Sequence, residues 1–287
     1  MVQVAAVTMV HSERDMLPVW LRHHAAQVGL ENCFVVDHGS DDGSTTGLGR
    51  VNVVRLPRSS LDDRKRTAFM SEFCGNLLKY YDAVIHSDVD ELVVADPAYY
   101  TGLSGFCATM PAPVMTAIGL DVHHSPVMEP PINPARPISQ QRPWVRFVSP
   151  FCKPAAISRP VTWAPGFHSC DAPIHFGRLF LFHLKQHDAG RGLRRLHRTR
   201  ALARTDPTVP WHQAITDDEF TRSLVWHWRE MPHVEGVSLE MDDEPLKGWL
   251  DGIVADQAKH DGQQYRLSLD KLETALWRLP ERFVGTF

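Results

Sequence analysis

The sequence predicts an α/β fold in which a mostly parallel central sheet is flanked by helices. Two observations lead to this prediction. In the N-terminal third of the chain, short apolar runs rich in β-branched residues alternate with segments whose apolar residues recur at helical spacing. The apolar runs also end in polar clusters, as the strands of a buried parallel sheet do where they meet their loops. Strands and helices that alternate in this way indicate βαβ units joined by right-handed crossovers.

The first strand is expected over residues 2–10, where no basic segment precedes the apolar run as it would in a signal peptide. A helix is expected over residues 16–27, because Leu17, Trp20 and Leu21 fall on one helical face. The other expected elements are strands over residues 33–36, 51–56, 83–86 and 178–183 and a helix over residues 64–81.

Residues 111–165 have a different texture. Prolines are frequent there, and the apolar residues show no clear period. Long stretches without regular structure are usually functional when they occur in compact domains. We therefore expect this segment to cross the sheet as a loop and to close over a ligand site as a lid.

Composition places the chain among ordinary globular proteins, with 43% hydrophobic and 22% charged residues in 287. A formal net charge of -4 argues against a general nucleic-acid-binding protein, which usually presents a basic face. No apolar run reaches the roughly 18 residues that a membrane-spanning helix requires. The five cysteines include no CxxC pair, which favours reduced thiols and a cytoplasmic location.

The first candidate site follows the second expected strand. Asp37 begins a polar stretch in which Gly39 and Gly43 permit tight turns. In open α/β sheets, ligands bind at the carboxyl ends of the strands, so Asp37 is placed to accept hydrogen bonds from a ligand. An ordinary polar turn explains the same residues equally well.

The second candidate site follows the strand at residues 83–86. In the sequence Ser-Asp-Val-Asp-Glu over residues 87–91, alternate carboxylates are placed to reach one divalent cation. A hard ion such as Mg²⁺ or Mn²⁺ accepts a few carboxylates and leaves positions for phosphate oxygens. A solvated acidic turn is the alternative, but the apolar strand in front of the acids favours a metal site.

Taken together, these residues resemble a known family. Thr8 and Glu13, then Val-Asp-His-Gly-Ser-Asp-Asp-Gly-Ser over residues 36–44, then Asp-Val-Asp-Glu over residues 88–91 resemble the family 2-like glycosyltransferases in order and spacing. The most similar branch carries a DVDE form of the DxD motif.

A later element resembles the same branch, which has a histidine and basic residues near the end of the catalytic domain. His183 and Lys185, followed by Arg191 and Arg194, match it. The resemblance covers roughly residues 2–205. Within it, His38 replaces the second acid of the usual family pattern, and the family's later acidic pair is absent.

The resemblance implies a GT-A fold, which is Rossmann-like. Residues 1–205 would form the catalytic domain, with a donor-binding half at about residues 1–110 and an acceptor half at about residues 111–205. Residues 206–287 show no such resemblance, and we expect them to form a helical extension packed on that domain.

The implied activity is the metal-dependent transfer of a sugar from a nucleoside-diphosphate sugar, expected to be a UDP-sugar, to a hydroxyl acceptor such as a glycan. Mn²⁺ or Mg²⁺, held by Asp88, Asp90 and His183, would stabilise the departing diphosphate. The residues that would bind the nucleotide sugar are Thr8, His11, Glu13, Asp37, Ser40, Lys65, Arg66 and Asp88.

The resemblance leaves the catalytic base undefined, because the family's acidic pair is missing. An inverting reaction needs a carboxylate that deprotonates the acceptor hydroxyl. Asp171 is the first candidate, with Glu129 and Asp121 behind it, and His168 is a candidate for the same place.

Two other functions remain open at this stage. A nucleotidyltransferase also uses paired carboxylates and Mg²⁺, but such enzymes usually carry a glycine-rich phosphate loop after the first strand. Here that position reads His-Ser-Glu-Arg-Asp over residues 11–15. An inactive protein that binds carbohydrate or nucleotide on the same fold is the second alternative, and the intact Asp88 and Asp90 argue against it.

Overall fold

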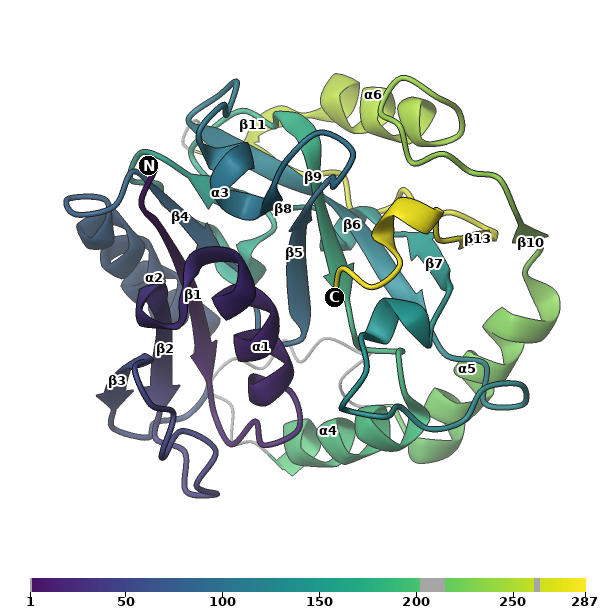
Figure 1. Ribbon diagram of the computed structural model, residues 1–287, viewed down its shortest axis with the longest axis horizontal. Coiled ribbons are helices and arrows are strands. Elements are labelled where there is room, and N and C mark those ends of the chain that lie inside the picture. Colours follow the sequence, from purple (N-terminus) through teal and green to yellow (C-terminus); the bar gives the residue numbers. More distant parts are fainter. Residues whose placement is uncertain (1, 202–214, 261–263) are drawn as a thin grey trace.

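The computed structural model describes residues 2–201, 215–260 and 264–287. Among these residues, one mixed sheet of eleven strands forms the centre of the molecule, and α-helices cover both of its faces (Figure 1). The longest path through the sheet has the strand order β10-β13-β7-β6-β8-β4-β1-β2-β3. No helix among the described residues has the length and apolar character needed to cross a membrane.

The N-terminal half of the sheet is parallel, as the alternating pattern predicts. It contains β1 (Val4–Val10), β2 (Cys33–His38), β3 (Asn52–Leu56) and β4 (Ala83–His86). β1 lies between β2 and β4, β3 is the edge strand, and all three pairings are parallel. The carboxyl ends of these strands therefore meet at one edge of the sheet.

Two helices cover opposite faces of this parallel half: α1 (Leu17–Val28) and α2 (Asp63–Leu77). Successive residues of β1 explain this arrangement, since side chains alternate between the two faces of a strand. Ala6 packs in the cluster that contains the α1 residues. Ala5 and Val7 pack in the cluster that contains the α2 residues. Both faces of β1 are thus buried, which accounts for its continuous apolar sequence.

The second half of the sheet is largely antiparallel. Its strands are β5 (Glu91–Ala95), β6 (Val114–His123), β7 (Trp144–Phe147), β8 (Lys153–Ile157) and β9 (Phe176–His183). β8 joins the two halves by pairing antiparallel with both β4 and β6. β9 pairs parallel with β6 on one side and antiparallel with β5 on the other. The sheet is therefore parallel at one end and mixed at the other.

The expectation of a structureless lid over residues 111–165 is wrong. This segment contains β6, β7 and β8, and β6 is buried along its whole length. Pro154 lies within β8, opposite Thr116, where the pairing of the two strands shifts register. A proline lacks the amide hydrogen needed for a ladder hydrogen bond and is tolerated at such irregularities. A strand paired on both sides belongs to the core and does not open as a lid.

The C-terminal region is only partly helical. Its helices are α5 (Asp217–Glu230) and α6 (Leu246–Asp256). β13 (Leu276–Arg278) pairs with β7, and β10 (His233–Val234) pairs with β13, so this region also extends the main sheet. The structure also contains the short elements α3 (Gly102–Cys107), β11 (Ala258–His260) and β12 (Gln264–Arg266). The expected domain boundary between residues 205 and 206 lies outside the described residues.

Candidate functional site

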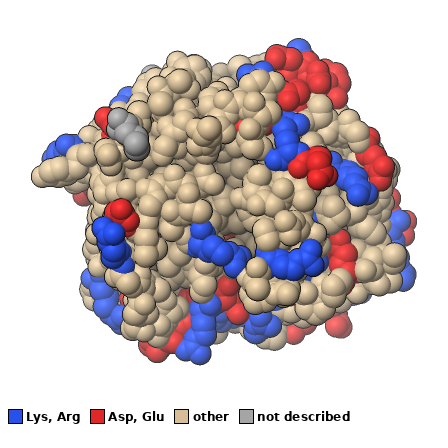
Figure 2. Space-filling view, in the orientation of Figure 1, with Lys and Arg blue, Asp and Glu red and all other residues tan. Residues whose placement is uncertain are grey.

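A cavity of about 410 Å³ lies at the carboxyl edge of the parallel strands. The ends of β1, β2 and β9 line it, together with the loop after β4 and the helix α4 (Ala189–Ala201). In the orientation of Figure 1, α4 runs along the lower side of the molecule, beneath the ends of β1 and β5. Acidic and basic side chains mix along this same lower edge in the space-filling view (Figure 2).

The register of the sheet brings the acidic motif and His183 together. In the ladder between β5 and β9, Glu91 is the partner of His183. In the ladder between β6 and β9, Asp121 is the partner of His183 on the other side. The Leu184 amide donates a 2.8 Å hydrogen bond to the Asp90 carbonyl, which ties the loop after β4 to the end of β9.

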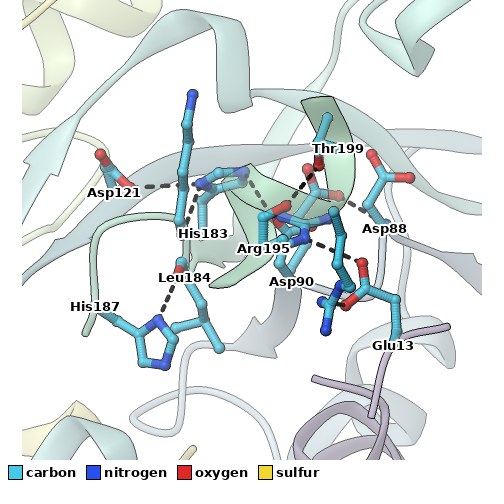
Figure 3. A network of polar contacts seen from close by, with 12 residues as sticks. Glu13, Asp88, Asp90, Asp121, His183, Leu184, His187, Arg195 and Thr199 are labelled. Carbon is cyan, nitrogen blue, oxygen red and sulfur yellow. Dashed lines mark hydrogen bonds and ion pairs between the residues drawn. The ribbon is translucent and has the colours of Figure 1, made fainter. Parts of the chain in front are cut away.

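Asp90 is the acid of the motif that meets His183. The carboxylate Oδ2 of Asp90 lies 3.4 Å from Nε2 of His183, and both residues are buried (Figure 3). Asp90 also forms an ion pair with Arg195 of α4. Burial alone would raise the pKa of Asp90, but the nearby charge of Arg195 outweighs it and lowers that pKa. Asp90 is therefore held as a carboxylate.

Asp88 faces two cations instead of His183. It forms an ion pair with Arg66, and its Oδ2 lies 2.8 Å from Nζ of Lys153. Lys153 lies only 2.5 Å from the buried Glu91 as well. Burial opposes the ionised form of Asp88, yet Arg66 and Lys153 hold the pKa of Asp88 well below its usual range. Burial raises the pKa of Glu91, despite the nearby charge of Lys153.

Helix α4 closes one side of the cavity with arginines. Arg195 lies between two carboxylates: it pairs with Asp90, and its Nε lies 3.1 Å from Glu13. Arg198, one turn further along, reaches Glu13 at 2.8 Å, and Arg194 reaches Asp15 at 3.0 Å. Residues three or four apart lie on one helical face, so α4 presents a basic face to the loop after β1.

The predicted metal ligands are only partly brought together. Asp90 and His183 are neighbours, whereas the Asp88 carboxylate is directed to Arg66 and Lys153. Within the described ranges, no three His, Cys, Asp or Glu side chains converge closely enough to hold a metal ion by themselves. Asp90 and His183 therefore offer two ligands, and the rest of a coordination shell would have to come from other groups.

The predicted nucleotide-binding residues divide into two groups. His11, Glu13, Arg66 and Asp88 line the cavity. The other four do not: Thr8, Asp37 and Ser40 are buried, and 84% of the Lys65 side chain is exposed.

Asp37 is a structural residue of the turn after β2. Its Oδ1 accepts a 2.7 Å hydrogen bond from the Ser40 amide, and its Oδ2 accepts bonds from Thr45 and Arg55 at 2.8 and 2.9 Å. Its side chain is fully buried in this turn, and its contact with a ligand stays a prediction. Burial opposes its charge, but these hydrogen bonds and Arg55 lower its pKa. The neighbouring Gly39 has φ 69°, a left-handed conformation that glycine adopts without strain.

Asp37→Ala is therefore expected to affect stability more than ligand binding. Three donors lose their acceptor, so the free energy of unfolding should fall by roughly 2–4 kcal/mol at neutral pH. Because the pKa of Asp37 is lowered in the folded state, this contribution is present above the unfolded pKa and is lost as pH falls through the folded pKa. Urea unfolding at pH 7 and at pH 3 measures it. Asp41→Ala, at an exposed neighbouring position, is the control; an equal loss in both variants would contradict the assignment.

The candidate bases Asp171, Glu129 and His168 lie in different places. Asp171 accepts a hydrogen bond from the Thr162 amide and pairs with Arg159. Glu129 accepts from the Ser125 amide. Neither carboxylate lines the cavity, because both stabilise loops outside it. His168 does line it, and burial, aided by Lys153, lowers the pKa of His168 to about 4.

Sequence reasoning missed several residues of the cavity. Lys153 lies in the segment expected to be a loop, where no local pattern singles it out. Arg195 lies in a basic stretch whose helical spacing, with Arg191 one turn before it, could have marked a common face. Arg58 also lines the cavity, and so does Glu91, which belongs to the predicted acidic motif but carries no predicted role.

Comparisons with known proteins find partial structural similarity and no match in sequence. No protein-family model matches the chain, and no curated protein matches it in sequence. The resemblance to the family 2-like glycosyltransferases therefore stays a prediction.

Two solved structures are similar in part. One is a mannosyltransferase from Pyrobaculum calidifontis in complex with GDP-mannose and Mn²⁺, with 15% identity, a TM-score of 0.27, and coverage of 43% of this chain and 36% of that one. The other is a mannose-1-phosphate geranyltransferase from Thermus thermophilus, with 12% identity, a TM-score of 0.30, and coverage of 77% of this chain and 64% of that one. The match thus spans about a third of the first protein and less than two thirds of the second.

Proposed function

We propose that this protein is a metal-dependent glycosyltransferase that moves a sugar from a nucleoside-diphosphate sugar to a hydroxyl acceptor such as a glycan. The observation that carries the proposal is the pairing of Asp90 and His183, 3.4 Å apart, in a cavity lined by cationic side chains. We propose a UDP-sugar as the donor and the cytoplasm as the location of the reaction.

The Asp90 and His183 pair fits a divalent cation. Two ligand atoms that each lie about 2.1 Å from one ion are separated by about 3 Å when they occupy adjacent positions, close to the observed separation. A mixed oxygen and nitrogen set suits Mn²⁺ better than Ca²⁺, and Mg²⁺ would rely more on the carboxylate. When bound, the ion would supply positive charge to the leaving diphosphate. Diphosphate oxygens and water would complete its coordination.

The cations around the cavity fit a diphosphate. Arg66, Lys153, Lys185, Arg191 and Arg195 line it, and most of the carboxylates beside them are already paired with these cations. In a buried site, such preorganised charges stabilise developing negative charge more strongly than water does. Leaving-group stabilisation is therefore the main catalytic contribution that we assign to these side chains.

The acceptor hydroxyl needs a proton acceptor if the anomeric centre inverts. Of the four predicted bases, His168 is the one that lines the cavity, and its low pKa leaves its imidazole neutral at pH 7. We assign His168 this role in preference to Asp171 and Glu129, which are engaged with loops elsewhere.

A screen of nucleotide sugars tests the proposal. Purified protein is incubated with UDP-glucose, UDP-N-acetylglucosamine, UDP-galactose and GDP-mannose, each with Mn²⁺, with Mg²⁺ or with EDTA. We expect release of nucleoside diphosphate from a UDP-sugar, dependent on the metal. A parallel reaction contains UTP and a sugar 1-phosphate; release of pyrophosphate there would favour a nucleotidyltransferase. Absence of turnover, together with absence of UDP binding in calorimetry with Mn²⁺, would contradict both enzymatic readings.

A further inference from the structure

Asp121 lies directly behind His183, on the side away from Asp90. It is a buried residue of β6, and the parallel ladder between β6 and β9 sets it opposite His183. Its Oδ1 lies 3.4 Å from Nδ1 of His183, while Nε2 of the same ring lies 3.4 Å from Asp90. Figure 3 shows the imidazole between the two carboxylates. Asp121 does not line the cavity, so we assign it no contact with the acceptor.

The plane of the His183 ring is fixed from another direction. The Phe151 ring stacks on it with centroids 3.9 Å apart and an angle of 9° between the planes. Phe151 can approach because Gly119 of β6 has no side chain: a Cβ there would lie 2.4 Å from the Phe151 carbonyl carbon. Phe151 thus sets the plane of the ring. The hydrogen bonds of the two ring nitrogens then decide whether Nε2 offers a proton or a lone pair to the cavity.

Two groups compete for Nδ1 of His183. The Lys185 amide lies 3.3 Å from it and would donate to a lone pair there, whereas the Asp121 carboxylate requires a proton on the same nitrogen. A lone pair on Nδ1 would face the negative charge of Asp121 across 3.4 Å without a proton between them, whereas the proposed cation would lie between the Nε2 lone pair and Asp90. A hydrogen bond to a carboxylate is stronger than one between neutral groups, so the proton on Nδ1 prevails.

We propose that Asp121 is a positioning residue of this site: it accepts the Nδ1 proton of His183 and thereby directs the Nε2 lone pair of His183 toward a divalent cation shared with Asp90. This inference rests on the proposed function, since it requires the cation. Histidines that bind metals almost always donate their second ring proton to a carboxylate, a carbonyl or water, which fixes both tautomer and orientation. The Nε2 atom of the neighbouring His123 lies 3.6 Å from the other Asp121 oxygen, and His123 does not line the cavity.

The inference is tested by Mn²⁺ binding, without any sugar donor. The affinity is measured by calorimetry, and pulsed electron paramagnetic resonance detects the nitrogen-14 coupling of an imidazole bound to Mn²⁺. Asp121→Ala should weaken Mn²⁺ binding by roughly 10–100-fold and diminish the nitrogen signal. Asp121→Asn keeps an acceptor oxygen of the same shape and should show a smaller loss. It also serves if the alanine variant fails to fold.

A double variant separates positioning from a general structural role. If Asp121 acts through His183, Asp121→Ala should add little further loss of Mn²⁺ affinity in a His183→Ala background. Asp96→Ala is the matched control. Asp96 is also a buried carboxylate and pairs with Arg282 at 2.9 Å, but it follows the last residue of β5, at the end of the strand away from Glu91. This control should lose stability and keep its Mn²⁺ affinity.

The outcomes are distinguishable. Wild-type protein that binds no Mn²⁺ would overturn the proposed function and this inference together. Wild-type binding with unchanged affinity and unchanged nitrogen signal in both Asp121 variants would overturn the inference alone. Additive losses in the double variant would also overturn it, since they would show that Asp121 acts independently of His183.

Discussion

Asp90→Asn is expected to reduce metal-dependent sugar transfer by roughly 100–1000-fold, the loss typical when one preorganised charge is removed from a transition state. The substitution keeps the shape of the side chain but removes the negative charge that we propose a cation shares with His183. His183→Ala removes the second ligand, and its effect should be of similar size. Both are measured as Mn²⁺-dependent release of nucleoside diphosphate from the donor that the screen identifies.

The stability and the Mn²⁺ affinity of the two variants decide how their losses of activity are interpreted. Both variants should remain folded, and both should require higher Mn²⁺ concentrations for half-maximal activity. His175→Ala is the matched control, because His175 is exposed and lies just before β9, the strand that carries His183. Full activity and full Mn²⁺ affinity in His183→Ala would remove the histidine from the site and leave Asp90 without its proposed partner.

Lys153→Met should cost the protein about 3–5 kcal/mol of unfolding free energy at pH 7, because it leaves the buried Glu91 and the partly buried Asp88 without their shared cation. Lys153 lies 2.8 Å from Asp88 and 2.5 Å from Glu91, and all but 8% of its side chain is buried. Methionine fills a similar volume, so the loss reports on charge more than on packing. Arg66 still faces Asp88 in the variant, whereas Glu91 loses the closest cation around it.

The size of this effect should depend on pH. In the wild type the pKa of Asp88 is lowered, so its pairing stabilises the fold above the unfolded pKa and is lost as pH falls through the folded pKa. Burial raises the pKa of Glu91, so the variant gains most by protonating this residue. The deficit of Lys153→Met should therefore be largest near pH 7 and smaller near pH 5.

Urea unfolding at both pH values measures this difference, and two further variants control it. Lys65→Met removes an exposed lysine and should leave the free energy of unfolding nearly unchanged. Lys153→Met combined with Glu91→Gln should recover part of the loss, because an amide costs less to bury than an unpaired carboxylate. A deficit that is independent of pH and unaffected by Glu91→Gln would point to lost packing instead of charge.

The parallel half of the fold was predictable because its signals are local. Each strand and helix there carries its own period, and side chains that alternate between two buried faces leave a continuous apolar run, as in β1. The acidic motif was predictable for the same reason: residues 87–91 follow a buried strand directly, and the carboxyl ends of parallel strands meet at one edge.

The antiparallel half was not predictable from local pattern. β6 is buried throughout and shows no alternation, and Pro154 makes β8 look unlike a strand although the register shift opposite it accommodates the proline. The strands of the C-terminal region are two and three residues long, too short to leave a period in the sequence.

The sequence by itself determined the parallel βαβ arrangement and the placement of Asp88, Asp90 and Glu91 at the end of a strand. Only the tertiary structure decided which side chains these acids meet. The pairing of β9 with β5 and β6 sets His183 beside Asp90 and in front of Asp121, and β8 brings Lys153 to Asp88 and Glu91. The tertiary structure also places the Asp37 carboxylate inside the turn after β2, where it accepts a hydrogen bond from the Ser40 amide. The physical reason is that strand pairing depends on packing between segments far apart in the chain, and no local period encodes which strands become neighbours or in which register.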